Sequence, residues 1–454
     1  MQLGRFGDAR LACVGGELLA AMLRKQTMCV HALAKDRSQS RRFHRFLDND
    51  AVSLHEMLVH AGRLTGGRVA GRHVLAISDT SEINFASHTG RKRGFGTVGN
   101  GVDIGVLLHP IIAVDAAQGG LIGLAGAEVM NRTDGRVTDH KRRGADEKES
   151  RRWLAGTETA GTMLSTAAMI TMVEDREGDI YDQFARRPEN VHLLVRAAQD
   201  RALEADQTLF AHCIGWPERA RYPVEVPSKP GRPGRTAMVA VRFGEVVLRR
   251  PAGAGKALPA TITLRVVDVS EVDPPSPKDR VRWCLLTTHT VQTEQDARQI
   301  VAWYQMRWII EQVFRTLKTD GVDIETSQIT RPANLLKLAV VALIAAVRVM
   351  QLVLARDGST GQGLSDAVEP ADVPALHAIN ATLQGPTEKL KNPFDCTSLA
   401  WLAWIAARMG GWAGYTSRGY RPAGPKTMAR GLRSLDPMVA GWNLSNRSAL
   451  LGLP

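Results

Sequence analysis

The segment Tyr304–Lys318, with the sequence YQMRWIIEQVFRTLK, is the most informative stretch of this chain. If it forms one helix at about 100° per residue, four polar side chains fall within an arc of about 60°: these are Tyr304, Arg307, Glu311 and Lys318. A separate apolar stripe is expected to dock on a core and consists of Met306, Ile310, Val313 and Leu317. The pattern therefore places one carboxylate among a phenol and two cations, or it is a solvated helix face with intrahelical ion pairs.

The composition indicates a large globular protein with a nucleic-acid partner. The chain has 454 residues, 44% of them hydrophobic, which suffices for a sizeable core and more than one domain. Its 58 Lys and Arg against 46 Asp and Glu give a formal charge of +12 and a pI near 9.8. Five scattered cysteines form no C-x-x-C pair, so neither disulfides nor a zinc site are predicted, and a reducing cytoplasm is favoured.

Neither a secretion signal nor a membrane span is expected. The first residues, MQLGRFGDARL, carry charges early and lack a long apolar core. The most apolar stretch, Leu338–Val347, has ten residues and is followed by Arg348. It is too short to cross a bilayer and is predicted to be a buried helix.

The sequence predicts five consecutive regions. Residues 1–70 are a helical domain, 71–199 and 281–370 are two parts of one α/β core, 200–280 are a β-rich insertion, and 371–454 are helical. Core strands are predicted for HVLAISD, GVLLHPIIAV, LIGLAGAEVM, AAMITMVED, HLLVRA and RWCLLTT, and core helices for EKESRRWLAG and GDIYDQFARR. The first three strands are expected to form a meander. The insertion contains strands at TAMVAVRF and ATITLRVVDV, and its basic loop at residues 229–235 either clamps a phosphate backbone or is a solvated hairpin tip.

A basic patch in the first region is predicted to contact DNA. Its cations are Lys35, Arg37, Arg41, Arg42 and Arg45. They attract phosphates, while Phe43 and Phe46 between them are expected to anchor the helix to its own core. A DNA-binding module is favoured here over a merely solvated face.

Three acids are candidates for a metal site. Asp79 and Asp175 end two predicted strands, and Glu311 lies on the later helix. This order of elements is that of a ribonuclease-H-like nuclease core, where strands about 4.8 Å apart bring such acids together. Convergent carboxylates require hard divalent cations, and two Mg²⁺ ions about 3.5–4 Å apart suit phosphodiester hydrolysis and transfer. Alternatively, Asp79 and Asp175 only cap the loop or helix that follows them.

The motifs together resemble one family. The spacing Tyr304-x2-Arg307-x3-Glu311-x6-Lys318 resembles the tyrosine, arginine, glutamate and lysine signature of the insertion-sequence-four family of bacterial DDE transposases, which includes the transposase of transposon five. Asp79-Thr80 resembles its first-aspartate motif, with Ser81 where a second threonine is common, and residues 175–181 (DREGDIY) resemble the second. The likeness extends over nearly the whole chain: residues 6–11 and 42–49 are similar to the end-binding domain, 200–280 to the β-rich insertion, and 399–414 with 424–427 to the dimerisation domain.

The resemblance implies a fold and an activity. It implies an α/β ribonuclease-H-like catalytic core with a β-rich insertion, flanked by helical amino- and carboxy-terminal domains. The implied activity is cut-and-paste transposition, in which hydrolysis nicks each transposon end, a DNA hairpin forms and opens, and the 3′-ends attack target DNA. Asp79, Asp175 and Glu311 would hold two Mg²⁺ ions, with Mn²⁺ as a substitute. The implied partners are double-stranded DNA, as transposon end repeats and target, and a second copy in a synaptic homodimer on the bacterial nucleoid.

The resemblance also implies DNA contacts. Tyr304, Arg307 and Lys318 would grip phosphates near the scissile bond. Trp283 would stack on a base flipped out of the hairpin, whereas the sequence alone fits ordinary strand packing. Further implied or expected DNA contacts are Trp308, Arg176, Arg41, Arg42 and Arg45. The carboxy-terminal tryptophans either form a core or join two subunits; they are Trp401, Trp404 and Trp412.

Two other function classes compete with a transposase. One is a non-catalytic DNA-binding regulator that binds ends and dimerises without cutting. The other is a ribonuclease-H-like nuclease or junction resolvase without strand transfer. The presence of all three acids argues against the first, and the insertion with Trp283 argues against the second.

Overall fold

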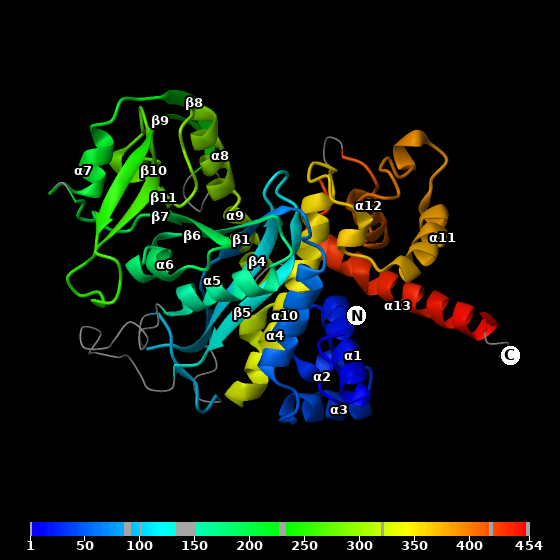
Figure 1. Ribbon diagram of the computed structural model, residues 1–454. Helices are drawn as coiled ribbons and strands as arrows, with labels where there is room; N and C mark the ends of the chain where they lie inside the picture. Colours follow the sequence, from blue (N-terminus) through cyan, green and yellow to red (C-terminus); the bar gives the residue numbers. More distant parts are fainter. Residues whose placement is uncertain are drawn as a thin grey trace. The chain divides into compact units, whose positions relative to one another are not determined.

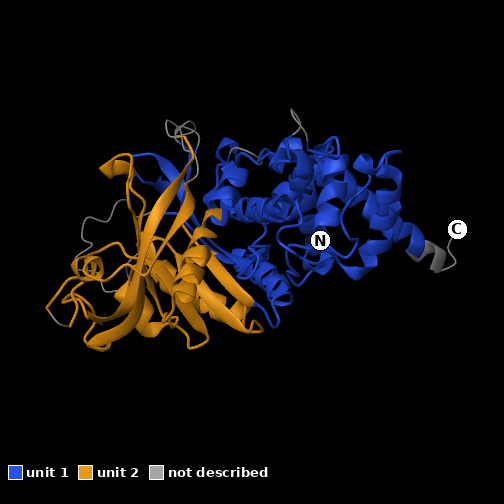
Figure 2. Ribbon diagram, turned by 90° about the horizontal axis from the view of Figure 1, so that it is seen from above, with its two compact units in different colours: residues 1–72, 80–137, 309–454 blue, residues 73–79, 138–308 orange. Residues whose placement is uncertain are grey.

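The computed structural model describes residues 2–85, 92–99, 102–132, 151–204, 206–226, 233–318, 322–416 and 421–450 (Figure 1). These residues belong to two compact units (Figure 2). The first unit comprises Met1–Arg72, Thr80–Val137 and Ile309–Pro454. The second comprises His73–Asp79 and Thr138–Trp308.

The first unit begins with four helices: α1 (Ala9–Lys25), α2 (Val30–Leu33), α3 (Arg37–Asp48) and α4 (Leu54–Gly66). Asp36 begins α3 by accepting a hydrogen bond from the backbone N–H of Gln39 at 2.8 Å, which satisfies a donor that the helix leaves unpaired. The Phe43 and Phe46 side chains on α3 are 0% and 1% exposed. Their predicted role as anchors to the helix's own core is therefore confirmed.

The apolar stretch of the sequence lies on α10 (Pro332–Ala355). The predicted buried helix is confirmed, but its predicted length is wrong, because it has 24 residues and continues past Arg348. By length and composition alone α10 is long enough to cross a membrane, yet 83% of its most apolar window is buried inside the structure. Such burial is typical of the core helix of a globular unit.

The strands of the first unit are antiparallel. β4 (Ile104–Asp115) pairs with β5 (Leu121–Met130), with β2 (Ser81–Asn84) and with the short β3 (Gly96–Thr97). The predicted runs at β4 and β5 are confirmed. β4 and β5 pair as the predicted meander requires, and the short β2 and β3, which precede β4 in the chain, were not predicted.

The carboxy-terminal part of the first unit is helical. After α9 (Trp308–Lys318) and α10, it contains α11 (Val373–Leu383), α12 (Leu399–Met409) and α13 (Pro425–Leu450). Trp401 and Trp404 on α12 are each 2% exposed. These two tryptophans therefore belong to the core of their own chain.

The second unit has parallel strands followed by antiparallel ones. β1 (His73–Ser78), β6 (Met169–Glu174) and β7 (Val191–Arg196) pair in parallel, as the crossover helices α5 (Arg151–Met163) and α6 (Tyr181–Arg186) between β6 and its neighbours allow. The strand order continues as β7-β11-β10-β9-β8, all antiparallel. The bounds of these last strands are β8 Ala220–Val226, β9 Arg235–Arg249, β10 Thr261–Glu271 and β11 Arg282–Thr287. The small helix α7 (Leu209–Ile214) packs on β9 and β10.

Most predicted elements of the second unit occur where the sequence placed them. Two predicted segments lie partly outside the described residues. They are residues 147–150 of the predicted helix EKESRRWLAG and residues 229–232 of the basic loop. The remainder of that loop leads into β9, whose first residue is Arg235.

The prediction of one helix over Tyr304–Lys318 is wrong. α8 (Glu294–Gln305) ends at Gln305, and α9 begins at Trp308, with Met306 and Arg307 in a turn between them. The backbone N–H of Arg307 bonds to the carbonyl of Tyr304 at 3.1 Å, three residues back, which is tighter than the α-helical spacing of four. The turn breaks the helical phase, so Tyr304 and Arg307 do not share a continuous helix stripe with Glu311 and Lys318.

Candidate active site

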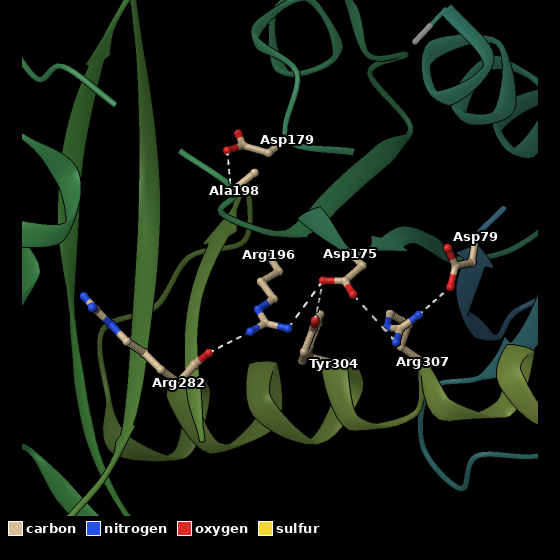
Figure 3. A network of polar contacts seen from close by, with 8 residues as sticks. All are labelled: Asp79, Asp175, Asp179, Arg196, Ala198, Arg282, Tyr304 and Arg307. Carbon is tan, nitrogen blue, oxygen red and sulfur yellow. Dashed lines mark hydrogen bonds and ion pairs between the residues drawn. The ribbon is translucent and has the colours of Figure 1, made fainter. Parts of the chain in front are cut away.

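Strand register places Asp79 beside Asp175. β1 and β6 run parallel, and Ile77 pairs with Val173. Continuing the same register by two residues sets Asp79 opposite Asp175, just beyond the carboxyl ends of both strands. Figure 3 shows the two carboxylates on either side of Arg307. The pairing of the strands thus brings together two acids that are 96 positions apart in the sequence.

Arg307 connects the two aspartates. Its Nη1 donates to Asp79 Oδ2 at 2.7 Å, and its Nη2 lies 3.8 Å from Asp175 Oδ2 (Figure 3). The Arg307 side chain is 12% exposed, against 20% for Asp79 and 31% for Asp175. The carboxylates are therefore more open to solvent than the guanidinium that neutralises them.

Tyr304 supplies a hydrogen bond from the last turn of α8. Its hydroxyl donates to Asp175 Oδ1 at 3.1 Å. Burial, and next the negative charge of Asp175, raise the pKa of Tyr304 to about 12, so the phenol keeps its proton at neutral pH. The Trp283 ring on β11 lies against the Tyr304 ring, with centroids 5.6 Å apart and planes tilted by 60°. Trp283 is half-buried, so part of its ring faces solvent.

Arg196 is a site residue that the sequence analysis missed. Glu174 pairs with Val195 in the parallel β6–β7 register, so the same register sets Arg196, the last residue of β7, opposite Asp175. Arg196 Nη1 lies 3.6 Å from Asp175 Oδ1, and its Nη2 donates to the main-chain oxygen of Arg282 at 3.0 Å (Figure 3). The available signal was a cation at the end of the predicted strand HLLVRA.

A second acid lies behind Asp175. Glu174 is fully buried, accepts a hydrogen bond from Gln183 Nε2 at 2.6 Å, and receives one from Ser78 Oγ at 3.3 Å. Burial raises the pKa of Glu174 to about 8. At neutral pH this carboxyl group is mostly protonated, so it adds little negative charge behind Asp79 and Asp175.

Asp179, the other acid of the DREGDIY motif, has a structural role. Its side chain is 0% exposed and accepts from Arg201 Nε at 2.7 Å. It also accepts from the backbone N–H of Ala198 at 2.8 Å (Figure 3) and from that of Gln199 at 3.3 Å. Asp179 therefore ties the segment after β6 to the segment after β7, the strand that ends at Arg196.

The remaining residues predicted for the site occupy several elements. Glu311 lies half-buried in the first turn of α9 and belongs to the first unit. Lys318, at the end of α9, is 4.0 Å from Glu325. Trp308 is 38% exposed, and Arg176 is exposed on the short 3₁₀ turn directly after Asp175.

The basic patch on α3 faces outward. Arg41, Arg42 and Arg45 are all exposed, and Arg42 Nη2 pairs with Glu17 at 2.9 Å. Arg41 and Arg45 can thus offer their charge to a phosphate directly, whereas Arg42 would first have to leave Glu17.

The aspartate pair fits a hard divalent cation. Asp79 and Asp175 offer carboxylate oxygens, the donor type that Mg²⁺ and Mn²⁺ prefer, and one cationic group already lies between them. Among the residues that the structure describes, no three His, Cys, Asp or Glu side chains lie together as a ready metal cluster. The structure thus brings together Asp79, Asp175, Tyr304 and Arg307. Of Glu311 we describe only its position in the first turn of α9.

Comparison with known families agrees with this arrangement. The sequence model of the family described as "Transposase DDE domain" matches residues 107–348, which is more than half of the chain. The matched segment includes Asp175, Tyr304, Arg307 and Glu311, and Asp79 lies before it. The match, together with the aspartate pair at the ends of parallel strands, shows that this chain belongs to the Transposase DDE domain family and is a DNA transposase.

Proposed function

We propose that this transposase belongs to the insertion-sequence-four group and moves its element by a cut-and-paste reaction with a hairpin intermediate. The observation that carries the proposal is the contact of Tyr304 and Arg307 with the two register-paired aspartates. Tyrosine and arginine thereby stand at the acids, in the order and spacing of the group's signature, ahead of Glu311 and Lys318. A ribonuclease-H-like topology fits the parallel strands β1, β6 and β7 with a β-rich insertion before β11.

Asp79, Asp175 and Glu311 are the residues that we expect to hold two Mg²⁺ ions. Bound ions of this kind supply activation of a nucleophilic oxygen and stabilisation of a leaving oxygen. The chain's own contribution is to orient the acids, through strand register for Asp79 and Asp175 and through the first turn of α9 for Glu311. The neutral Glu174 keeps the charge behind these acids low.

Tyr304, Arg307, Lys318 and Arg196 are the expected phosphate ligands next to the scissile bond. A guanidinium binds a phosphate through two parallel N–H groups, and a phenol with a raised pKa remains a donor. Arg176 and Trp308 are exposed beside the same segments. Arg176 and Trp308 can therefore meet DNA from exposed positions, whereas Tyr304, at 5% exposed, would contact a phosphate only at the aspartate pair.

Trp283 is the expected stacking platform for a flipped base. Its ring is half-buried against Tyr304, so one part is fixed by packing while another remains accessible. Stacking of a base on such a ring contributes about 1–3 kcal/mol. This contribution offsets part of the strain of a DNA hairpin.

The expected partners are transposon ends, target DNA and a second copy of the chain. Arg41 and Arg45 on α3 present unshielded charge for phosphates. On α13, Met438 and Trp442 are 49% and 41% exposed and lie one turn apart, which supplies an apolar surface for a homodimer. We place the protein in the bacterial cytoplasm at the nucleoid, in keeping with five free cysteines.

Incubation with supercoiled DNA that carries the repeats flanking the reading frame tests this proposal. With Mg²⁺, the wild-type protein should release a fragment with hairpinned ends. Glu311→Ala should abolish cleavage and leave end binding nearly intact, whereas Glu294→Ala, a matched acid in the first turn of α8, should cleave normally. Plain nicks without hairpins would indicate a nuclease or resolvase, and retarded but intact DNA would indicate a regulator. Loss of end binding together with cleavage in Glu311→Ala would contradict a metal-binding role.

A further inference from the structure

Arg307 holds the oxygens that a metal ion between Asp79 and Asp175 would require. The guanidinium reaches Oδ2 of both carboxylates, at 2.7 Å and 3.8 Å (Figure 3). Magnesium binds such oxygens at about 2.0–2.1 Å and demands a nearly ideal geometry. Two cations between the same two carboxylates repel each other, so the guanidinium and a bridging ion compete for the same place.

Tyr304 and Arg196 do not compete in the same way. Tyr304 and Arg196 both approach Oδ1 of Asp175, at 3.1 Å and 3.6 Å, and leave its Oδ2 to Arg307. They support one aspartate from the side, whereas Arg307 is the group that the structure shows in reach of both. Removal of Arg307 therefore exposes the bridging position while the lateral contacts remain.

The position of Arg307 in the chain suits a side chain with two alternative partners. It lies in the turn between α8 and α9, outside both helical ranges. Its partners on the aspartates are partly solvent-exposed, at 20% and 31%, so water and anions can reach the ion pairs. A DNA phosphate offers the guanidinium an equivalent pair of charge-assisted hydrogen bonds.

We propose that Arg307 guards the aspartate pair in the free protein, and that a DNA phosphate must draw its guanidinium away before a divalent cation binds there with full affinity. This inference rests on the proposed function, in which Asp79 and Asp175 hold metal and Arg307 contacts phosphate. By linkage, DNA then strengthens metal binding, and metal strengthens DNA binding by the same factor. A full metal site is thereby assembled on DNA rather than in the free protein.

Binding of Mn²⁺ to the full-length protein, measured by electron paramagnetic resonance of free Mn²⁺, tests the proposal without reference to activity. The titration is done with and without a short duplex taken from the DNA that flanks the reading frame. For the wild type, DNA should raise the Mn²⁺ affinity by about 5- to 150-fold, the usual range for coupled sites. Arg307→Gln should bind Mn²⁺ without DNA nearly as tightly as the wild type does with DNA, and added DNA should change its affinity little.

Matched variants separate the guard from general electrostatics. Arg298→Gln removes a cation of α8 whose ion pair is with Glu294, so it should retain the DNA dependence of the wild type. Asp79→Asn with the duplex gives the background of Mn²⁺ bound to DNA itself. The wild-type protein by itself already tests the proposal, because its Mn²⁺ affinity must increase when DNA is added. If Arg307→Gln folds poorly, Arg307→Lys serves as a milder variant.

The outcomes distinguish the guard from the function on which it rests. Equal Mn²⁺ affinity of the wild type with and without DNA overturns the guard and leaves a metal-dependent transposase intact. Equal increases of the DNA-free Mn²⁺ affinity in Arg298→Gln and Arg307→Gln, each relative to the wild type, also overturn it, because net charge alone then explains the effect. No Mn²⁺ binding above the Asp79→Asn background in any sample overturns both the guard and the proposed function.

Discussion

Replacing Asp179 with asparagine should destabilise the second unit by about 3–5 kcal/mol, because it leaves a buried charge without its partner. The Asp179 carboxylate is 0% exposed and the Arg201 guanidinium only 7% exposed. Asparagine keeps the size of the side chain and one acceptor oxygen, so the backbone N–H of Ala198 can still be bonded. What is lost is the negative charge that compensates Arg201.

The expected change in melting temperature follows from the size of the unit. For a unit of 150–250 residues, each kcal/mol shifts the midpoint by about 2–4 °C, so the transition of this unit should fall by about 6–20 °C. The midpoint is measured by circular dichroism or by differential scanning fluorimetry with the purified protein. The neighbouring helix supplies a matched control in Asp182→Asn, which breaks an i,i+4 pair with the 42%-exposed Arg186. That change should cost less than about 1 kcal/mol.

A double variant identifies the cause of the loss. Arg201→Met in the Asp179→Asn background removes the unpaired charge and should restore part of the lost stability. The reasoning is refuted if Asp179→Asn lowers the melting temperature no more than the Asp182→Asn control does. It is also refuted if the double variant is less stable than Asp179→Asn alone. Either result would mean that the buried pair does not support the segment after β7.

Three further predictions concern acid stability, DNA binding and the hairpin. Burial and the neighbouring His192, His73 and Arg187 lower the pKa of His289 from 6.5 to about 3, so its contribution to stability is complete above pH 6.5 and is lost as the pH falls towards 3. The corresponding free energy is at most about 5 kcal/mol at 1.36 kcal/mol per pH unit, and thermal melts from pH 7 to pH 4 should show a smaller decline for His289→Gln than for the wild type. Changing Arg41 and Arg45 together to alanine should weaken end binding and reduce the slope of log affinity against log salt by about 2, measured by fluorescence anisotropy, while an unchanged slope would exclude phosphate contacts by both. Trp283→Ala should lose about 1–3 kcal/mol of hairpin stabilisation, seen as nicked ends that accumulate on a sequencing gel, and normal hairpin yield would remove Trp283 from that role.

The sequence was sufficient for the parts of the site that depend on local patterns. Apolar runs that end in Asp79 and Asp175 predicted two strands with acids at their ends, and both strands occur there. Interleaved phenylalanines on α3 correctly predicted which face of that helix is buried. In each case, the signal is the alternation or spacing of apolar residues within a dozen positions.

The parts that depend on pairing between distant segments could not be predicted. The adjacency of Arg196 to Asp175 follows from the β6–β7 register, which no local pattern specifies. The turn at Met306–Arg307 was missed because neither glycine nor proline marks it, and each of its residues is compatible with a helix. The different roles of Asp175 and Asp179 were hidden for a similar reason, because both acids occur in one motif and only burial distinguishes them.

The contacts of Asp179 with the segment after β7 are made to main-chain N–H groups, and this has a practical use. The side chains of Ala198 and Gln199 are exposed and take no part in those hydrogen bonds. Any residue with a backbone N–H preserves the support, and only proline removes it. A cysteine introduced at position 198 or 199 would therefore carry a fluorophore or a photocrosslinker two or three residues from Arg196, reporting on the arrival of DNA while the strand ends keep their positions.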